Sequence, residues 1–166
     1  MNQTPTDFTP MPWMRFANQR IGVTEANRQT VKYFQGITNA NNTDLTGKDG
    51  AELPWCSCFT NWCMTQARMA GTGKSGASTW LTWGTDATRD VARRVTRKAP
   101  YGSIVVLSPD SANRDTTGHV SFLLEITATD VLLLGGNQDN IVEAKSYKLT
   151  RVRTYRWPSG FAMPPP

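Results

Sequence analysis

The sequence predicts an α+β fold in which helices come first and an antiparallel sheet of about five strands follows. Before position 100 the apolar residues recur at helical spacing, whereas after it they form short β-branched or aromatic runs separated by turn residues. At 166 residues the chain has the size of one domain with one core. We therefore expect a single domain over residues 1–166, with flexible ends at about 1–11 and 159–166.

Two helices are expected near the N-terminus. The first begins at Pro12, whose fixed φ suits the first turn of a helix, and continues to Ile21. The second runs from about Asn27 to Gly36. Residues 37–53 are rich in Asn, Thr, Asp and Gly and are expected to form a loop, which is longer than a compact domain usually contains without a use.

Two further helices are expected before the sheet. The first of them begins beside Pro54 and ends near Gly71, and its apolar positions recur at helical spacing: Cys56, Phe59, Cys63, Ala67 and Ala70. The second carries a face of cations: Arg89, Arg93, Arg94, Arg97 and Lys98. Such a face is either simply solvated or available to an anionic partner.

The expected strands all follow Pro100 and are separated by turn residues. They are SIVVL, HVSFLLEIT, DVLLLGG, NIVEAKSYKL and VRTYRW. Because the helices precede the strands along the chain, rather than alternating with them, the fold class is α+β.

The net charge of +5 favours an anionic partner. The sequence has no zinc-finger, RNP or clear helix-turn-helix signature, so we expect no nucleic acid partner. A cell-wall polymer and a membrane surface are anionic partners that fit the positive charge equally well. No stretch approaches the roughly 18 to 20 consecutive apolar residues that span a bilayer. We therefore expect no transmembrane segment.

The sequence argues against a phosphate-binding loop, a disulfide framework and a zinc site. The GTGKS segment at 71–75 resembles a phosphate-binding loop, but Arg68 stands where that motif requires its first glycine. The three cysteines lie within eight residues and leave one thiol unpaired, so a disulfide framework is not expected. A zinc site needs three or four ligands, and the only other soft ligand is His119. We expect neither a metal nor an organic cofactor.

Cys56 and His119 are the candidates for nucleophilic catalysis. Cys56 falls in the first turn of the third expected helix, where backbone N–H groups and the helix dipole stabilise a thiolate and can hold an oxyanion. His119 is the only histidine in the chain and begins a strand, which aims its ring rigidly. A buried core thiol and a structural histidine are the alternative interpretations.

A third group is needed to fix the tautomer of the imidazole. The next strand ends in LLLGGNQDN, and an antiparallel neighbour brings this end back toward His119. We select Asn137 for this role, with Gln138 and Asp139 as less favoured candidates. A simple turn role for Asn137 is the alternative.

Four motifs in this order resemble the CHAP and NlpC-type branch of the papain-like cysteine hydrolases: PWCSCFTNWC, SGASTWLTWG, GHVSFLLE and LLLGGNQ. The resemblance extends over most of residues 13–158. Cys58 departs from it, because it stands where a small residue such as Ala is expected. The cysteine block is specific, whereas the other motifs gain weight from their order.

The resemblance implies a papain-like α+β fold in which the cysteine helix packs on the sheet that bears the histidine. It also implies hydrolysis of an amide bond in peptidoglycan, with Cys56 as nucleophile, His119 as general base and Asn137 as the orienting group. The cleft is expected to be lined by Glu52, Trp55, Trp80 and Trp83, with core packing as the alternative for the tryptophans.

The first dozen residues show no basic stretch followed by an apolar run. We therefore expect synthesis in the cytoplasm without a signal peptide, and action in the periplasm or cell wall after delivery by a secretion machine or during phage lysis. A toxin of this kind would have a periplasmic immunity protein as a partner. Two other functions stay open: acyl transfer or deamidation on a protein by the same Cys–His pair, and noncatalytic binding of wall polymer by a basic module.

Overall fold

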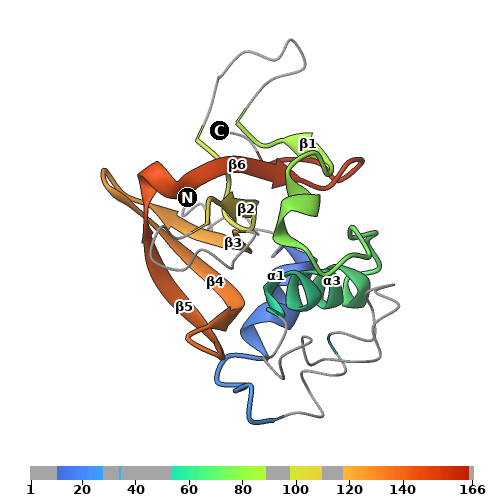
Figure 1. The fold of residues 1–166 in the computed structure, drawn as a ribbon. Coiled ribbons are helices and arrows are strands. Elements are labelled where there is room, and N and C mark those ends of the chain that lie inside the picture. Colours follow the sequence, from blue (N-terminus) through green and yellow to red (C-terminus); the bar gives the residue numbers. More distant parts are fainter. Residues whose placement is uncertain (1–10, 28–33, 35–53, 89–97, 110–117, 165–166) are drawn as a thin grey trace, which may run out of the picture.

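The computed structural model describes residues 11–27, 34, 54–88, 98–109 and 118–164. In these parts the fold is α+β, with helices on one side of an antiparallel sheet (Figure 1). The elements are α1 (Pro12–Asn18), α3 (Cys56–Gln66), η1 (Ala77–Trp80), β1 (Thr85–Asp86), β2 (Ile104–Leu107), β3 (His119–Ile126), β4 (Asp130–Gln138), β5 (Ile141–Lys148), η2 (Leu149–Arg151) and β6 (Val152–Trp157). The strand order is β1-β6-β2-β3-β4-β5.

The five expected strands are confirmed as β2 to β6, and the short β1 is an addition that the sequence did not predict. Helix α1 begins at Pro12 as predicted but ends at Asn18, and turns follow as far as Gly22, whose N–H donates to the carbonyl of Val142. Of the predicted second helix, the structure describes only Asn27, which is not helical, and Phe34, which is helical and buried. The predicted basic helix also lies outside them, apart from Lys98.

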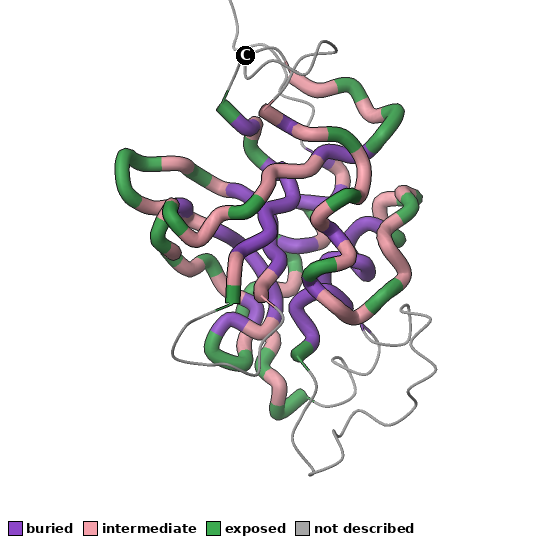
Figure 2. Tube along the Cα trace, turned by 45° about the horizontal axis from the view of Figure 1, so that its top comes forward, coloured by how far each residue is buried: buried purple, intermediate pink, exposed green. Residues whose placement is uncertain are grey.

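The core lies between α1, α3 and the sheet, where the buried residues gather (Figure 2). Gly136 allows α3 to approach β4, because a Cβ there would lie 2.5 Å from the ring of Trp55 and 2.7 Å from Cβ of Phe59. At the other end of the chain, Phe161 packs edge-to-face on Trp13 with ring centroids 5.1 Å apart. Phe161 belongs to the C-terminal segment, about 159–166, that the sequence predicts to be flexible. No helix in the described ranges is long and apolar enough to cross a membrane.

The last residues of β4 leave the regular ladder. The paired residues of β3 and β4 begin at Phe122 with Leu134, and the register between β4 and β5 shifts between Gly135 and Gln138. Asn137 has a φ of +60° within this bulge. The end of β4 thus separates from the start of β3, and the N-terminus of α3 lies beside the gap.

Candidate active site

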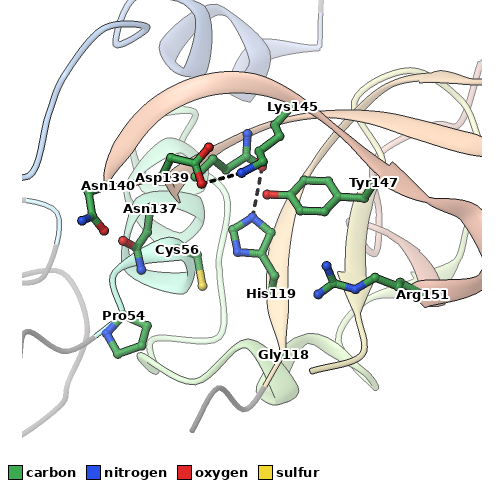
Figure 3. Close-up of a pocket in the computed structure, with 11 residues that line it drawn as sticks. Pro54, Cys56, Gly118, His119, Asn137, Asp139, Asn140, Lys145, Tyr147 and Arg151 are labelled. Carbon is green, nitrogen blue, oxygen red and sulfur yellow. Dashed lines mark hydrogen bonds and ion pairs between the residues drawn. The ribbon is translucent and has the colours of Figure 1, made fainter. Parts of the chain in front are cut away.

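A polar pocket opens where α3, β3 and the β4–β5 turn meet (Figure 3). The residues that line it are Pro54, Cys56, Gly118, His119, Asn137, Gln138, Asp139, Asn140, Lys145, Tyr147 and Arg151. Cys56 and His119, which are far apart in the sequence, both contribute to its wall. Figure 3 shows the sulfur of Cys56 and the ring of His119 directed toward one another.

Cys56 is the first residue of α3, as predicted, and only 3% of its surface is exposed. The N–H of Leu123 in β3 donates to the carbonyl of Ser103, which lies beside β2. Because the N–H groups of successive residues in a strand point to opposite edges, the N–H of Val120, three residues earlier, points to the edge away from β2. That edge faces the gap left by β4. The N–H groups of Val120, Ser57 and Cys56 itself are directed at the sulfur.

Burial dominates the ionisation of Cys56. It raises the pKa of the thiol, and the three backbone N–H groups lower it by less. The N–H groups at the helix N-terminus thus stabilise the thiolate, as the sequence predicts, but burial outweighs them. A neighbouring base must remove the proton when the sulfur attacks.

His119 is held at the start of β3 by its neighbours on both sides. Gly118 precedes it with a φ of +99°, and a Cβ at Gly118 would lie 2.4 Å from the carbonyl oxygen of Leu107. The Nε2 atom of His119 lies 3.0 Å from Oε1 of Gln138 and 2.7 Å from Oγ of Ser121. The ring nitrogen on the Cys56 side is therefore Nδ1.

Gln138 fixes the tautomer of this ring. The side chain of Gln138 is buried, and its Nε2 donates to the carbonyl oxygens of Leu133 and Glu143 at 3.2 Å and 2.6 Å. Because a carbonyl oxygen cannot donate, the amide must present Oε1 to His119. The proton of the neutral imidazole then lies on Nε2, and the lone pair on Nδ1 faces the thiol.

The neutral form of His119 is strongly favoured. The pKa of His119 is lowered to about 4, because burial and, to a smaller extent, the charges of Arg151 and Lys145 outweigh the hydrogen bond to Gln138, which raises it. His119 as a whole is partly exposed and lines the pocket. In the resting protein, the pair is thus a thiol beside a neutral imidazole.

The orienting contact belongs to Gln138 and not to Asn137, which corrects the selection made from the sequence. Asn137 lines the same pocket, because its φ of +60° breaks the alternation of the strand and directs two successive side chains into the site. In Figure 3 its amide lies on the Cys56 side of the pocket. Among the described contacts, the His119 ring bonds to Gln138 and Ser121.

The predicted tryptophans do not line the pocket. Trp55 and Trp80 are buried, with 1% and 0% of their surfaces exposed, so their predicted contact with substrate is wrong. Trp55 stacks on Phe34, and the Nε1 of Trp80 donates to Ser57. Trp83 packs edge-to-face on Trp80 and is not among the lining residues. Glu52, the remaining predicted contact, lies outside the described residues.

The opposite wall of the pocket was missed from the sequence. The ring of Tyr147 packs on that of His119 at a tilt of 35°, with centroids 5.5 Å apart, and burial raises the pKa of the Tyr147 hydroxyl well above the usual range. The Cζ of Arg151 lies 5.5 Å from the centre of the Tyr147 ring, and Lys145 forms an ion pair with Asp139. The signal available was the pairing of β5 with β4, which places alternate residues such as 145 and 147 on one face.

No cluster of three or more metal-ligating side chains occurs among the described residues. The three cysteines are buried thiols rather than disulfides.

Comparison with known proteins gives a family match. The model of the CHAP domain family matches residues 48–137, which include Cys56 and His119. A solved structure of NlpC1 from Trichomonas vaginalis is similar over 87% of this chain, with 14% identity and a TM-score of 0.45, and the match spans 42% of that chain. None of the curated proteins matches significantly.

Proposed function

Because the chain belongs to the CHAP domain family, within the superfamily of peptidoglycan hydrolases and amidases, we propose that it cleaves an amide bond of the bacterial stem peptide or cross-link by cysteine catalysis. The observation that supports this proposal is the arrangement of Cys56, His119 and Gln138. A thiol, a base with its lone pair toward that thiol and a group that fixes the base are the parts of a cysteine hydrolase.

The reaction begins with transfer of the thiol proton. As Sγ of Cys56 forms a bond to the carbonyl carbon, Nδ1 of His119 takes the proton and the carbonyl oxygen becomes an oxyanion. The backbone N–H groups at the start of α3 are the donors available to this oxyanion. The C–N bond then breaks, and the imidazolium gives its proton to the leaving amine.

Water completes the turnover. His119, neutral again, removes a proton from water as the oxygen attacks the thioester, and the released thiolate takes that proton back from the ring. The hydrogen bond to Gln138 holds the Nε2 proton in place throughout, so the lone pair that accepts protons stays on the Cys56 side.

The charge of the pocket suits an anionic peptide. Lys145 and Arg151 lie on its wall with one acidic residue, Asp139. Their charges reach His119, since both lower the pKa of the ring. Wall stem peptides carry carboxylates beside their amide bonds, so the positive charge supports a substrate of this class.

Single substitutions test the proposal. Cys56→Ala and His119→Ala should each abolish release of new amino groups from purified peptidoglycan, because members of one catalytic unit fail singly. Cys58→Ala and Cys63→Ala are the matched controls, since these thiols lie in the same helix outside the pocket and should retain activity. Full activity of His119→Ala would overturn the proposal, because the chain has no second histidine.

The site of action is also proposed to be the periplasm or the wall, where peptidoglycan lies. Fusion to a periplasmic export signal should cause lysis of a Gram-negative host, and Cys56→Ala should remove it. Equal toxicity of the cytoplasmic form would instead favour acyl transfer or deamidation on an intracellular protein.

A further inference from the structure

The hydroxyl of Ser121 lies at the centre of the contacts that hold His119. Ser121 is two residues after His119 in β3, is completely buried and has its Oγ 2.7 Å from Nε2 of the ring. The same hydroxyl donates to Oε1 of Gln138 at 2.9 Å. Nε2, Oγ and Oε1 therefore form a closed triangle of hydrogen-bonding atoms.

Only one set of proton positions satisfies this triangle. Oε1 of Gln138 is an acceptor, because the amide nitrogen of that side chain faces two carbonyl oxygens. Ser121 gives its single hydroxyl proton to Oε1, which leaves its lone pairs for Nε2–H. The N–H of His119 is then shared between two neutral acceptors, one on Ser121 and one on Gln138.

Gly135 makes room for this hydroxyl. It lies in the neighbouring strand at the start of the β4 bulge, and a Cβ there would be 2.1 Å from Oγ and 2.8 Å from Cβ of Ser121. It would also be 3.2 Å from Oε1 of Gln138. The space that holds Ser121 therefore depends on the absence of a side chain at residue 135.

We propose that Ser121 is a positioning residue, whose oxygen accepts a second hydrogen bond from His119 and stabilises the imidazolium that forms when Cys56 loses its proton. An N–H of a charged ring is a stronger donor than that of a neutral one, so the second acceptor favours the charged form. The effect on the ring is independent of substrate. Its consequence for catalysis rests on the proposed function.

The other groups that face His119 come from three elements. Cys56 approaches from α3, Lys145 and Tyr147 from β5, and Arg151 from η2, with Asp139 paired to Lys145 at the turn. The two cations oppose protonation of the ring. Ser121 and Gln138 favour protonation of the ring. Because both side chains are neutral, they do so less strongly than a carboxylate would, and the resting ring stays neutral.

The chain allows a direct test, because His119 is its only histidine and its imidazole signals need no assignment. Nitrogen-15 NMR of the wild type at pH 7 should show the proton on Nε2, and a titration should give the pKa. In Ser121→Ala, the pKa of His119 should fall by about one unit, corresponding to loss of one hydrogen bond to a charged group.

Ser103→Ala is the matched control. Ser103 is also a completely buried serine in this sheet region, and its hydroxyl donates to the carbonyl of Pro100, away from the pocket. Its removal should leave the His119 titration unchanged. If Ser121→Ala does not fold, Ser121→Cys keeps a side chain of the same shape, slightly larger and with a much weaker acceptor, and should also lower the pKa of His119.

Activity gives the second readout. In Ser121→Ala, kcat on peptidoglycan should fall about ten-fold with KM unchanged. An unchanged or raised pKa of His119 in both Ser121 variants would overturn the proposal, whatever the activity. A lowered pKa in a protein that does not hydrolyse peptidoglycan would support the role of Ser121 and refute the proposed function instead.

Discussion

Alkylation of Cys56 by iodoacetamide should accelerate steadily with pH, because the resting protein holds a thiol beside a neutral imidazole. Burial raises the pKa of Cys56 and lowers that of His119 to about 4. At pH 7, three units higher, about one His119 ring in a thousand is protonated. The imidazolium that could hold a thiolate is therefore nearly absent at neutral pH.

The assay is the rate of carbamidomethylation at each cysteine, followed by fragment mass spectrometry from pH 5 to 9. The rate at Cys56 should rise about ten-fold per pH unit, since the thiolate fraction does so below the pKa of the thiol. Cys58 and Cys63 are internal controls, because they are buried outside the pocket and should label only on unfolding. His119→Ala should change the profile little.

A constant rate at Cys56 between pH 5 and 8 would refute this reasoning. Such a plateau is the behaviour of a thiolate held by an imidazolium, and its collapse in His119→Ala would prove the ion pair. Slow alkylation of Cys56 at neutral pH is therefore compatible with catalysis, because His119 removes the thiol proton only as the sulfur attacks.

Three further predictions concern the same site. Gln138→Leu should lower kcat about 100-fold or more, because it removes the acceptor that fixes the His119 tautomer, whereas Asn137→Ala should act more weakly; steady-state kinetics on peptidoglycan compares them, and an equal loss would contradict the assignment. Gly136→Ala should destabilise the fold by about 1–3 kcal/mol by pushing α3 from β4, and Gly76→Ala, whose Cβ would make only ordinary contacts, should not; urea unfolding measures both. The folded-state pKa of His119 lies below its usual 6.5, so the unfolded chain takes up the proton first and stability should fall by about 1–3 kcal/mol as the pH drops from 6.5 to 4; calorimetry should find this loss absent in His119→Ala, and an identical loss there would assign it elsewhere.

The sequence was sufficient for the fold class and for the places of Cys56 and His119. Both residues stand at the start of an element with a clear local signal, a helix after Pro54 and a strand after Gly118. A residue at the start of an element can be located without knowledge of its neighbours. That is why these two positions could be predicted from local patterns.

The partner of His119 could not be predicted in the same way. The choice between Asn137 and Gln138 depends on the β4 bulge, and neither spacing nor composition indicates a positive φ at a non-glycine residue. A regular strand would direct only one of the two side chains to the site. The role of Ser121 could not be predicted either, because it depends on the space that Gly135 leaves for the hydroxyl in the neighbouring strand.

The aromatic residues were misplaced for a different reason. Trp55 precedes the nucleophile in sequence, but its indole turns into the core, where Gly136 leaves room for it. The sequence alone does not distinguish a tryptophan that packs in the core from one that contacts substrate beside a catalytic residue. The cationic wall formed by Lys145 and Arg151 depends on the pairing of β5 with β4 and on the short helix η2 that follows β5.

The central claim is tested most directly by mass spectrometry of the fragments released from purified sacculi. Wild-type protein should generate fragments with one new amino and one new carboxyl end at an amide bond of the stem peptide or cross-link, and Cys56→Ala should generate none. Intact stem peptides and cross-links after prolonged incubation with folded wild-type protein, across walls of different peptide chemistry, would contradict the account.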